Sequence, residues 1–329
     1  MINLEIKPNT TYDVRSAQIF IKDKNSTLSD TVQVTQAAKG IYIGDIIFTT
    51  EQDLIDFQAA GYTKVRGNVI VSGGEITTLQ KLDNLLTEIN GSLRLECSTL
   101  TTLDGLYGLK TITDSLIIKD GDMTSFEGLR NLETIGGNFK VIVKSSLKSL
   151  VSFKGLSGLK SIGGDFEVNA KSYSLKSLAS FEGLESLETI GGNFRVIAES
   201  SSSSSSSLES LSSFKGLSGL KSIGGDFEVN AKSYSLNSLA SFEGLESLTN
   251  IGGGRLTINK CSSLNNIDAL KNIESLNDIS ITECPKLYDF CVLKNVVQNM
   301  SGTFYLNKNG YNPTKYQLLN GECSQIPQE

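Results

Sequence analysis

The chain of 329 residues contains no histidine and no tryptophan. Histidine is the commonest general base in enzymes and the commonest metal ligand in proteins, so its absence weakens both roles. The cysteines show no CxxC spacing, and a zinc ion would therefore need isolated thiolates alone. The sequence has no P-loop, and its Gly-Gly pairs lack the GxGxxG context of a dinucleotide site. We therefore expect a protein that is not an enzyme and that has no metal and no other cofactor.

The chain also lacks the features of proteins that bind nucleic acids or cross membranes. Its net charge of −6 is spread along the sequence without a run of Lys or Arg, so we expect no nucleic-acid partner. No apolar stretch reaches the 18 residues of a membrane-spanning helix. Met1 is not followed by the charged and apolar stretches of a signal peptide. Either the protein is cytosolic, or the true N-terminus is missing from this chain.

A long internal repeat dominates the sequence. Residues 152–192 and 213–253 are identical except that the second copy has Asn237, Thr249 and Asn250. In and just before the first copy, apolar residues occur at every third position and then alternate at Phe166 and Val168. The every-third positions are Leu147, Leu150, Phe153, Leu156, Leu159 and Ile162. This pattern fits neither a helix nor a simple strand, and it predicts one coil of a parallel β-solenoid.

Similar short strands recur at intervals of 23 to 33 residues. Each is preceded by an apolar residue and one or two small residues. Their openings are Val65, Ile89, Ile112, Ile135, Ile162, Ile190, Ile223, Ile251, Leu276 and Met300. We therefore expect a mainly β protein whose residues 67–306 form about ten coils. Glycines after the opening residue fit corners where φ is positive or where the backbone is crowded. The serine-rich run 200–207 is expected to be a loop between two coils.

Alternation within the strands predicts one inward and one outward set of side chains. The outward column is Arg94, Ile117, Lys140, Glu167, Arg195, Glu228, Thr257, Ser280 and Tyr305. Charges of alternating sign within it have two interpretations: they fix the register of neighbouring coils and keep the surface soluble, or they form a recognition face. For the second interpretation the candidate ligand-binding residues are Arg94, Lys140, Glu167, Arg195, Glu228 and Tyr305. Asn169, Asn230 and Asn259 are expected to form a polar ladder, with sugar contact as the alternative.

Carboxylates recur at Glu127, Glu182 and Glu243, once per two coils. We expect this spacing to place them tens of ångströms apart along the stack, too far for the paired carboxylates of a glycoside hydrolase.

Both ends of the solenoid need a cover, because an open coil exposes its core and strand edge to water. Residues 40–66 are expected to form the N-terminal cap, with a short strand pair at 40–48 and a helix at 50–60 that has Thr50 as its N-cap. Residues 307–329 are expected to form the C-terminal cap. Near this end, short helices are predicted at 289–299 and at 313–320, the second with Asn312 as its N-cap.

The five cysteines are Cys97, Cys261, Cys284, Cys291 and Cys323. Cys261 and Cys284 lie about one coil apart, so they are either stacked buried thiols or a disulfide between neighbouring strands. Cys291 and Cys323 are the second candidate disulfide pair.

Residues 1–38 lack the residue pattern of the coils, and strands with alternating side chains are expected at Leu4–Ile6, Ser16–Lys22 and Thr31–Gln36. The segment IKPNTTYDVRSAQIFIKDKNSTLSDTVQVTQAA resembles the C-terminal half of a BACON domain, through Asn9, the run that begins at Arg15, and the run from Val34 to Ala38. BACON domains are Bacteroidetes-associated immunoglobulin-like sandwiches that often bind carbohydrate. The resemblance implies a partial, antiparallel β domain and a longer exported protein.

The coils, as in SFEGLESLETIGGNFRV, resemble the receptor L domain, a leucine-rich, right-handed β-helix, in its bacterial cell-surface form. This resemblance covers roughly residues 40–323. It implies an exported protein of the cell surface or outer membrane, held to the membrane only through a lipid anchor that this chain does not contain.

A long, rigid surface without catalytic groups favours a non-enzymatic binding or adhesion module, expected to be a monomer, that recognises an extracellular protein or glycan. The alternatives are a structural spacer that displays another domain of a surface lipoprotein and, with less support, a carbohydrate-active accessory protein.

Overall fold

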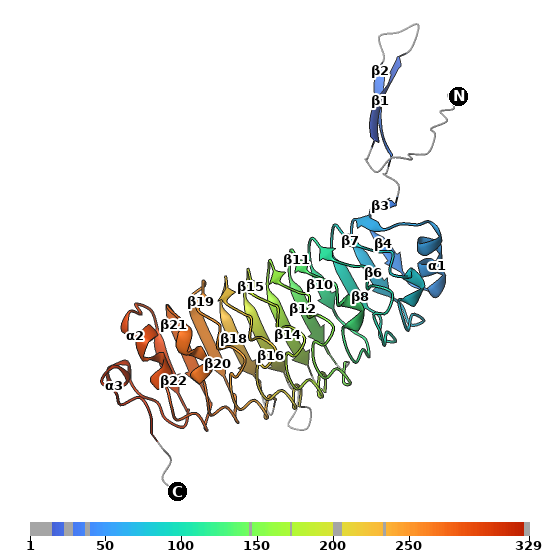
Figure 1. Ribbon diagram of the computed structural model, residues 1–329. Coiled ribbons are helices and arrows are strands. Elements are labelled where there is room, and N and C mark those ends of the chain that lie inside the picture. Colours follow the sequence, from blue (N-terminus) through green and yellow to red (C-terminus); the bar gives the residue numbers. More distant parts are fainter. Residues whose placement is uncertain are drawn as a thin grey trace.

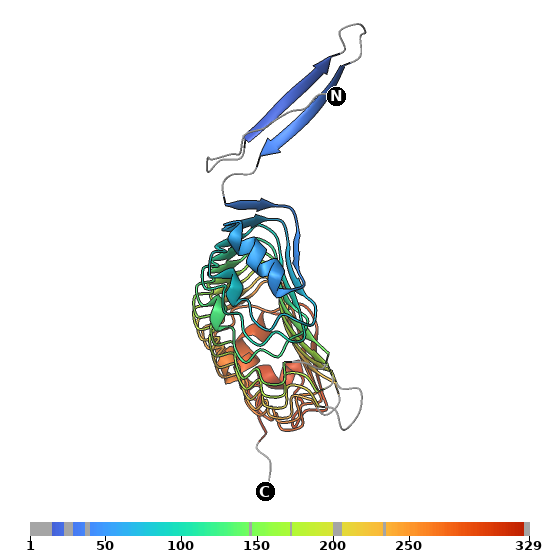
Figure 2. The same ribbon diagram turned by 90° about the vertical axis from the view of Figure 1, so that its right-hand side faces the viewer.

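The computed structural model describes residues 15–22, 29–36, 40–144, 147–171, 173–199, 206–232 and 235–325. From residue 40 onward the chain forms a β-solenoid with two parallel sheets (Figure 1). The described α-helices lie at the two ends of this solenoid (Figures 1 and 2). The mainly β solenoid expected from the repeat is thus confirmed.

The larger sheet has eleven strands, which pair in chain order with one strand per coil. They are β4 (Ile46–Phe48), β6 (Val69–Ser72), β8 (Leu93–Glu96), β10 (Leu116–Ile118), β12 (Phe139–Val143), β14 (Phe166–Lys171), β16 (Phe194–Glu199), β18 (Phe227–Ala231), β20 (Arg255–Asn259), β21 (Asp278–Thr282) and β22 (Phe304–Asn307).

The smaller sheet has nine short strands. They are β3 (Ile41–Ile43), β5 (Lys64–Arg66), β7 (Glu88–Ile89), β9 (Thr111–Ile112), β11 (Thr134–Ile135), β13 (Ser161–Ile162), β15 (Thr189–Ile190), β17 (Ser222–Ile223) and β19 (Asn250–Ile251). Short 3₁₀ turns occur at η1 (Gln80–Leu82), η2 (Glu127–Leu129), η3 (Asp268–Asn272) and η4 (Cys291–Leu293).

The first coil begins earlier than the sequence analysis places it. Strands β3 and β4 do not pair with each other; β3 pairs with β5 and β4 pairs with β6. Residues 40–66 therefore contain the first rung of the stack together with its covering helix, rather than a separate strand pair that precedes the coils.

The core consists of side chains stacked on their equivalents in the next coil. Every apolar residue of the period-three run from Leu147 to Ile162 is at most 1% exposed. Two columns of phenylalanines run along the axis with successive ring centroids 5.0–5.5 Å apart. One column is Phe126, Phe153, Phe181, Phe214 and Phe242, and the other is Phe139, Phe166, Phe194 and Phe227. Burying each such side chain contributes roughly 1.5–3 kcal/mol to stability.

Crowding explains the first glycine of each Gly-Gly corner. A Cβ at Gly163 would lie 2.0 Å from the carbonyl oxygen of Gly136, and one at Gly191 would lie 2.1 Å from that of Gly163. Neither glycine has a positive φ. Of the two reasons considered for these corners, close approach of neighbouring backbones is therefore the one that applies here.

Helix α1 (Glu51–Ala59) covers the first coil with Leu54 and Phe57. As predicted, Thr50 is its N-cap: its side chain accepts a hydrogen bond from the N–H of Asp53, whose carboxylate accepts one from the N–H of Thr50.

The C-terminal end carries α2 (Lys294–Gln298) and α3 (Lys315–Leu319). The N-cap of α3 is Thr314, not Asn312 as expected, because Thr314 forms a capping box with Gln317. Asn312 instead bonds to Asn309. The turn before the helix therefore uses the asparagine, and the helix begins two residues later than predicted.

The described N-terminal part is an antiparallel hairpin of β1 (Arg15–Lys22) and β2 (Ser29–Gln36). These strands match two of the three expected, and Leu4–Ile6 lies outside the described residues. Most described side chains of the hairpin are exposed, including Phe20 and Val32.

The corner geometry gives a direct test of stacking. Gly163→Ala is expected to lower the free energy of unfolding by about 1–3 kcal/mol or more, because the new methyl group must push two backbones apart. Gly74→Ala is the matched control, since a Cβ there meets nothing within 4 Å and no positive φ is required. Chemical denaturation followed by circular dichroism measures both, and equal effects would contradict the crowding explanation.

Candidate functional site

The outer face is defined as the solvent-facing side of the eleven-stranded sheet. Its first row follows the predicted outward column, in register from strand to strand: Arg94, Ile117, Lys140, Glu167, Arg195, Glu228, Thr257, Ser280 and Tyr305. The structure adds Ile47 and Ile70 at the N-terminal end of this row. The described α-helices lie at the ends of the solenoid, so they leave this face open (Figures 1 and 2).

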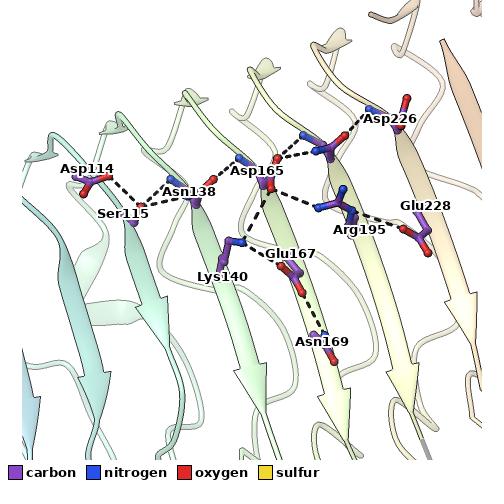
Figure 3. Close-up of polar contacts among 11 residues, drawn as sticks. Asp114, Ser115, Asn138, Lys140, Asp165, Glu167, Asn169, Arg195, Asp226 and Glu228 are labelled. Atoms are coloured by element: carbon purple, nitrogen blue, oxygen red, sulfur yellow. Dashed lines mark hydrogen bonds and ion pairs between the residues drawn. The ribbon is translucent and has the colours of Figure 1, made fainter. Parts of the chain in front are cut away.

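The charges in the middle of the row are paired with one another (Figure 3). Lys140 Nζ lies 3.3 Å from Glu167 Oε2, and Arg195 Nε lies 3.5 Å from Glu228 Oε2. Asp165, from the corner before β14, lies between the cations, 4.0 Å from Lys140 Nζ and 3.4 Å from Arg195 Nη1. Opposite charges in adjacent strands favour this register.

Alternating charges also occur beside the smaller sheet. Glu133 pairs with Lys160 of the next coil at 2.9 Å, and Glu188 pairs with Lys221 at 2.9 Å. Thus the alternation is not particular to the outer face.

The third side of the solenoid, formed by turns, repeats the pattern. Lys154 lies 3.6 Å from Glu127, and Lys215 lies 3.8 Å from Glu243. Because the same alternation occurs on all three sides, it favours the register interpretation of the charged row over recognition.

Glu127 and Glu182 are closer in space than the sequence analysis expects. Both line one depression of about 440 Å³ with Arg130, Lys154 and Glu185. Two coils of a solenoid span only about 10 Å, since neighbouring strands lie about 4.8 Å apart. A basic side chain separates the two carboxylates in the stack, because Lys154 belongs to the coil between them and pairs with Glu127.

A ladder of short polar side chains runs along the corner that precedes the outer face. The side-chain oxygen of each member accepts a hydrogen bond from the backbone N–H of the next, over donor–acceptor distances of 2.7–3.3 Å. The members are Asp45, Asn68, Ser92, Ser115, Asn138, Asp165, Asn193 and Asp226. Figure 3 shows the ladder from Ser115 to Asp226. The ladder was not predicted from the sequence, although each of its members directly precedes the first inward residue of a strand.

Asp165 links this ladder to the charged row. Burial alone would raise its pKa, but the hydrogen bonds from Asn193 and the charges of Arg195 and Lys140 outweigh burial and lower the pKa below its usual range. The carboxylate is therefore held in its ionised form.

The second row of the outer face contains the three asparagines expected to form a ladder. Asn259 donates to Asn230 Oδ1 at 3.1 Å, and Thr282 donates to Asn259 Oδ1 at 2.8 Å. Asn169 donates instead to Glu167 at 3.1 Å, because Ile197 separates it from Asn230. The ladder thus includes two of the three asparagines.

The two ends of the predicted column differ from its middle. Arg94 pairs with Glu96 of its own strand at 2.7 Å, and Glu96 also pairs with Lys119 at 2.9 Å. Bonds from Lys119 and Arg94 hold the pKa of Glu96 below its usual range. Tyr305, at the other end, is 49% exposed.

A depression of about 570 Å³ opens beside the N-terminal half of the outer face. Its lining comprises Glu96, Lys119, Asp120, Ile142 and Lys144. The structure thus places two acids, two bases and one apolar side chain around a hollow that was not predicted from the sequence. Its residues lie in or directly after three successive strands, β8, β10 and β12, so the spacing of the coils brings them together.

The two candidate cysteine pairs differ in whether they form a disulfide. Cys291 and Cys323 form a disulfide that joins η4 to the segment after α3. Cys261 and Cys284, the other pair considered, are free and buried, as is Cys97. The hydrogen bond with Cys284 and burial raise the pKa of Cys261, which keeps its thiol neutral. A disulfide is typical of proteins in oxidising surroundings, such as the cell exterior.

The serine run is only partly described, because Ser200–Ser205 lie outside the described residues. Ser207, expected within the loop, is buried and donates to the carbonyl oxygens of Ala170 and Glu199 at 3.1 and 3.2 Å. It therefore belongs to the solenoid wall.

Within the described ranges, no cluster of three or more Cys, Asp or Glu residues is arranged to hold a metal ion. The same part of the chain contains no helix with the length and apolar character needed to cross a membrane.

Comparison with known proteins gives one match. A family model described as "BACON: Putative binding domain, N-terminal" matches residues 2–37, whose described part is the hairpin β1–β2. No curated protein and no solved structure matches the chain. The N-terminal segment is therefore similar to a binding domain, and the solenoid that makes up most of the chain has no matched relative.

The environment of Asp165 predicts a pH-dependent contribution to stability. Because its folded-state pKa is lowered, the contribution is present above the unfolded value of about 3.9 and is lost as the pH falls through the folded value. Asp165→Asn keeps an oxygen for the ladder but loses the charge, so we expect a loss of about 0.5–1.5 kcal/mol at pH 7 that shrinks toward pH 3.

Urea unfolding of both proteins across this pH range measures the difference. Asp226→Asn is the matched control, since Asp226 has a ladder position but no ion pair among the described residues. A deficit for Asp165→Asn that persists unchanged at pH 3 would show that its charge is not the cause.

Proposed function

We propose that this protein is a non-catalytic binding module outside the cell whose outer face engages an extracellular protein or glycan. The observation that carries the proposal is the open face of the eleven-stranded sheet, which the described helices leave accessible along its length. Two further features support it: the disulfide Cys291–Cys323 favours an oxidising location, and residues 2–37 match a family described as a binding domain.

The chemistry of the face varies along the axis. In its middle, Lys140, Glu167, Arg195 and Glu228 neutralise one another, and a ligand would have to compete with these pairs. Toward the C-terminal end the first row becomes uncharged, with Thr257, Ser280 and the exposed Tyr305. Hydroxyl groups with an exposed aromatic ring suit polar, uncharged ligands.

The charged middle and the uncharged end therefore make different predictions about the ligand. Recognition by the middle requires a charged partner and depends on ionic strength. Recognition at the uncharged end requires no charged partner and does not depend on ionic strength. The depression lined by Lys119 and Lys144 lies beside the N-terminal half of the face and is a third place where a small polar group would fit.

The alternative is a rigid spacer that holds another domain away from the cell surface. Its specific support is the ladder from Asp45 to Asp226, which ties successive coils together along one corner. A spacer needs this stiffness but needs no ligand. A carbohydrate-active role has less support, because the carboxylates of the turn side are interleaved with lysines.

An array of glycans and extracellular matrix proteins, probed with the purified chain, tests the proposal. Two variants locate the contact. Reversal of all four charges (Lys140→Glu, Glu167→Lys, Arg195→Glu and Glu228→Lys), combined with Asp165→Asn, inverts the charges of the middle while neighbouring strands keep opposite signs. Tyr305→Ala removes the exposed ring. We expect a ligand whose binding falls by about tenfold or more with one variant and little with the other.

Unchanged circular dichroism spectra and melting temperatures are the control for folding. A hit that survives both variants would place the contact off these parts of the face. No hit on any array would contradict the binding proposal and favour the spacer.

A further inference from the structure

The last strand of the larger sheet, β22, has a partner on only one side. It pairs with β21, and the sheet order ends there. Figure 1 shows β22 at the C-terminal end of the sheet. Unpaired edges of this kind are templates for another strand unless the protein blocks them.

Within the described residues, the backbone of β22 has free N–H groups whose equivalents in the inner strands donate hydrogen bonds to the next coil. In inner strands, the N–H of the first inward residue donates to the carbonyl group just before the next strand. Examples are Phe139 to Asp165 at 2.8 Å and Ile279 to Thr303 at 2.7 Å. The equivalent groups in β22 are the N–H groups of Phe304 and, two residues on, Leu306. Neither makes a backbone hydrogen bond outside the β21 pairing to any described residue.

The inward side chains of β22 are also incompletely covered. Phe304 and Leu306 are half-buried, whereas their neighbours in β21, Ile279 and Ile281, are fully buried. The four residues of β22 include no charged residue and no proline, which commonly protect natural edges. Another strand would therefore both satisfy the backbone and complete the core.

The charged residues directly after the last three strands indicate which charge an added strand would have at the equivalent position. Lys260, Glu283 and Lys308 occupy equivalent positions in three successive coils, each with a φ of 56–60°. Their signs alternate, and the series ends on a cation. By the rule that governs the other sides of the solenoid, the next position favours an acidic residue.

We propose that the edge of β22 binds an extended segment of another protein as an added parallel strand. The segment has apolar residues beside Phe304 and Leu306, and Asp or Glu beside Lys308. This is strand addition, in which backbone hydrogen bonds provide affinity and alternate side chains provide specificity. The edge is separate from the outer face, so the inference goes beyond the proposed function and does not depend on it.

A second copy of this chain is a poorer occupant. Its first strand, β4, has one unpaired edge, and pairing through this edge would place Thr50 rather than an acid beside Lys308. In addition, the N–H of Thr49 already donates to Asp53 Oδ2 at 2.7 Å, and α1 begins just after it. Self-association through this edge would therefore disrupt the N-terminal cap.

The test uses the whole chain and a fluorescent synthetic peptide, acetyl-Ser-Val-Thr-Val-Thr-Glu-amide, in an anisotropy titration. We expect saturable binding that weakens by about tenfold or more when the two threonine amides are N-methylated, because these amides donate to β22. Replacing the peptide glutamate by lysine should weaken binding, and Lys308→Glu should restore it. Lys81→Glu, at an exposed lysine of η1 far from β22, is the matched control and should not restore it.

Hydrogen exchange measured by NMR provides a second readout that needs no variant. The amides of Phe304 and Leu306 should exchange fast in the free protein and become protected when the peptide is added. The proposal is overturned if these amides are already protected, if the N-methylated peptide binds equally well, or if no peptide binds. Concentration-dependent dimers in sedimentation, lost on Leu306→Lys, would instead assign the edge to a second copy.

Discussion

The structure depends on the distance between hydrogen-bonded parallel strands, about 4.8 Å, which is repeated from coil to coil. At this distance every side chain lies against its equivalent in the next coil. Phenylalanines therefore stack on phenylalanines, and the first glycine of each corner faces a carbonyl group that leaves no room for a Cβ. The same distance makes like charges in register unfavourable, so acids and bases alternate. Core, corners and surface charge thus follow from one constraint.

This constraint also limits where a ligand can bind. Side chains in the interior of the stack have their partners within the stack: Lys140 has Glu167, and Asp165 has Asn193, Lys140 and Arg195. Unused bonding capacity remains where the repeat stops or changes. Such places are the edge of β22, the uncharged end of the outer face, and the hollow beside Lys144. A binding function therefore depends on departures from the repeat, and the regular part supplies rigidity.

The sequence predicts the regular features well because the repeat displays them many times. The period of three, the alternation at Phe166 and Val168, and the N-cap at Thr50 each depend on neighbouring residues, and the structure confirms them. Features that depend on the next coil were harder to predict. The ladder through Asn138 and Asp165 joins residues 27 positions apart, and its members differ in type, so no local pattern reveals it. The first coil was missed because β3 and β4 look like a strand pair in the sequence, and only their pairing with β5 and β6 shows that they belong to the stack.

The size of the near-identical repeat matches the alternation of charge along the stack. The start of the second copy, 213–253, lies two coils after the start of the first, 152–192. Equivalent residues of the two copies are therefore separated by one coil, which carries the opposite charge on every side of the solenoid. Arg195 separates Glu167 from Glu228, Glu188 separates Lys160 from Lys221, and Glu182 separates Lys154 from Lys215. The ladder follows the same rule, since Asn193 separates Asp165 from Asp226. A repeat of one coil would place like charges about 4.8 Å apart on all three sides at once. The stacking geometry therefore allows this solenoid to lengthen by two coils at a time, and it disfavours lengthening by one.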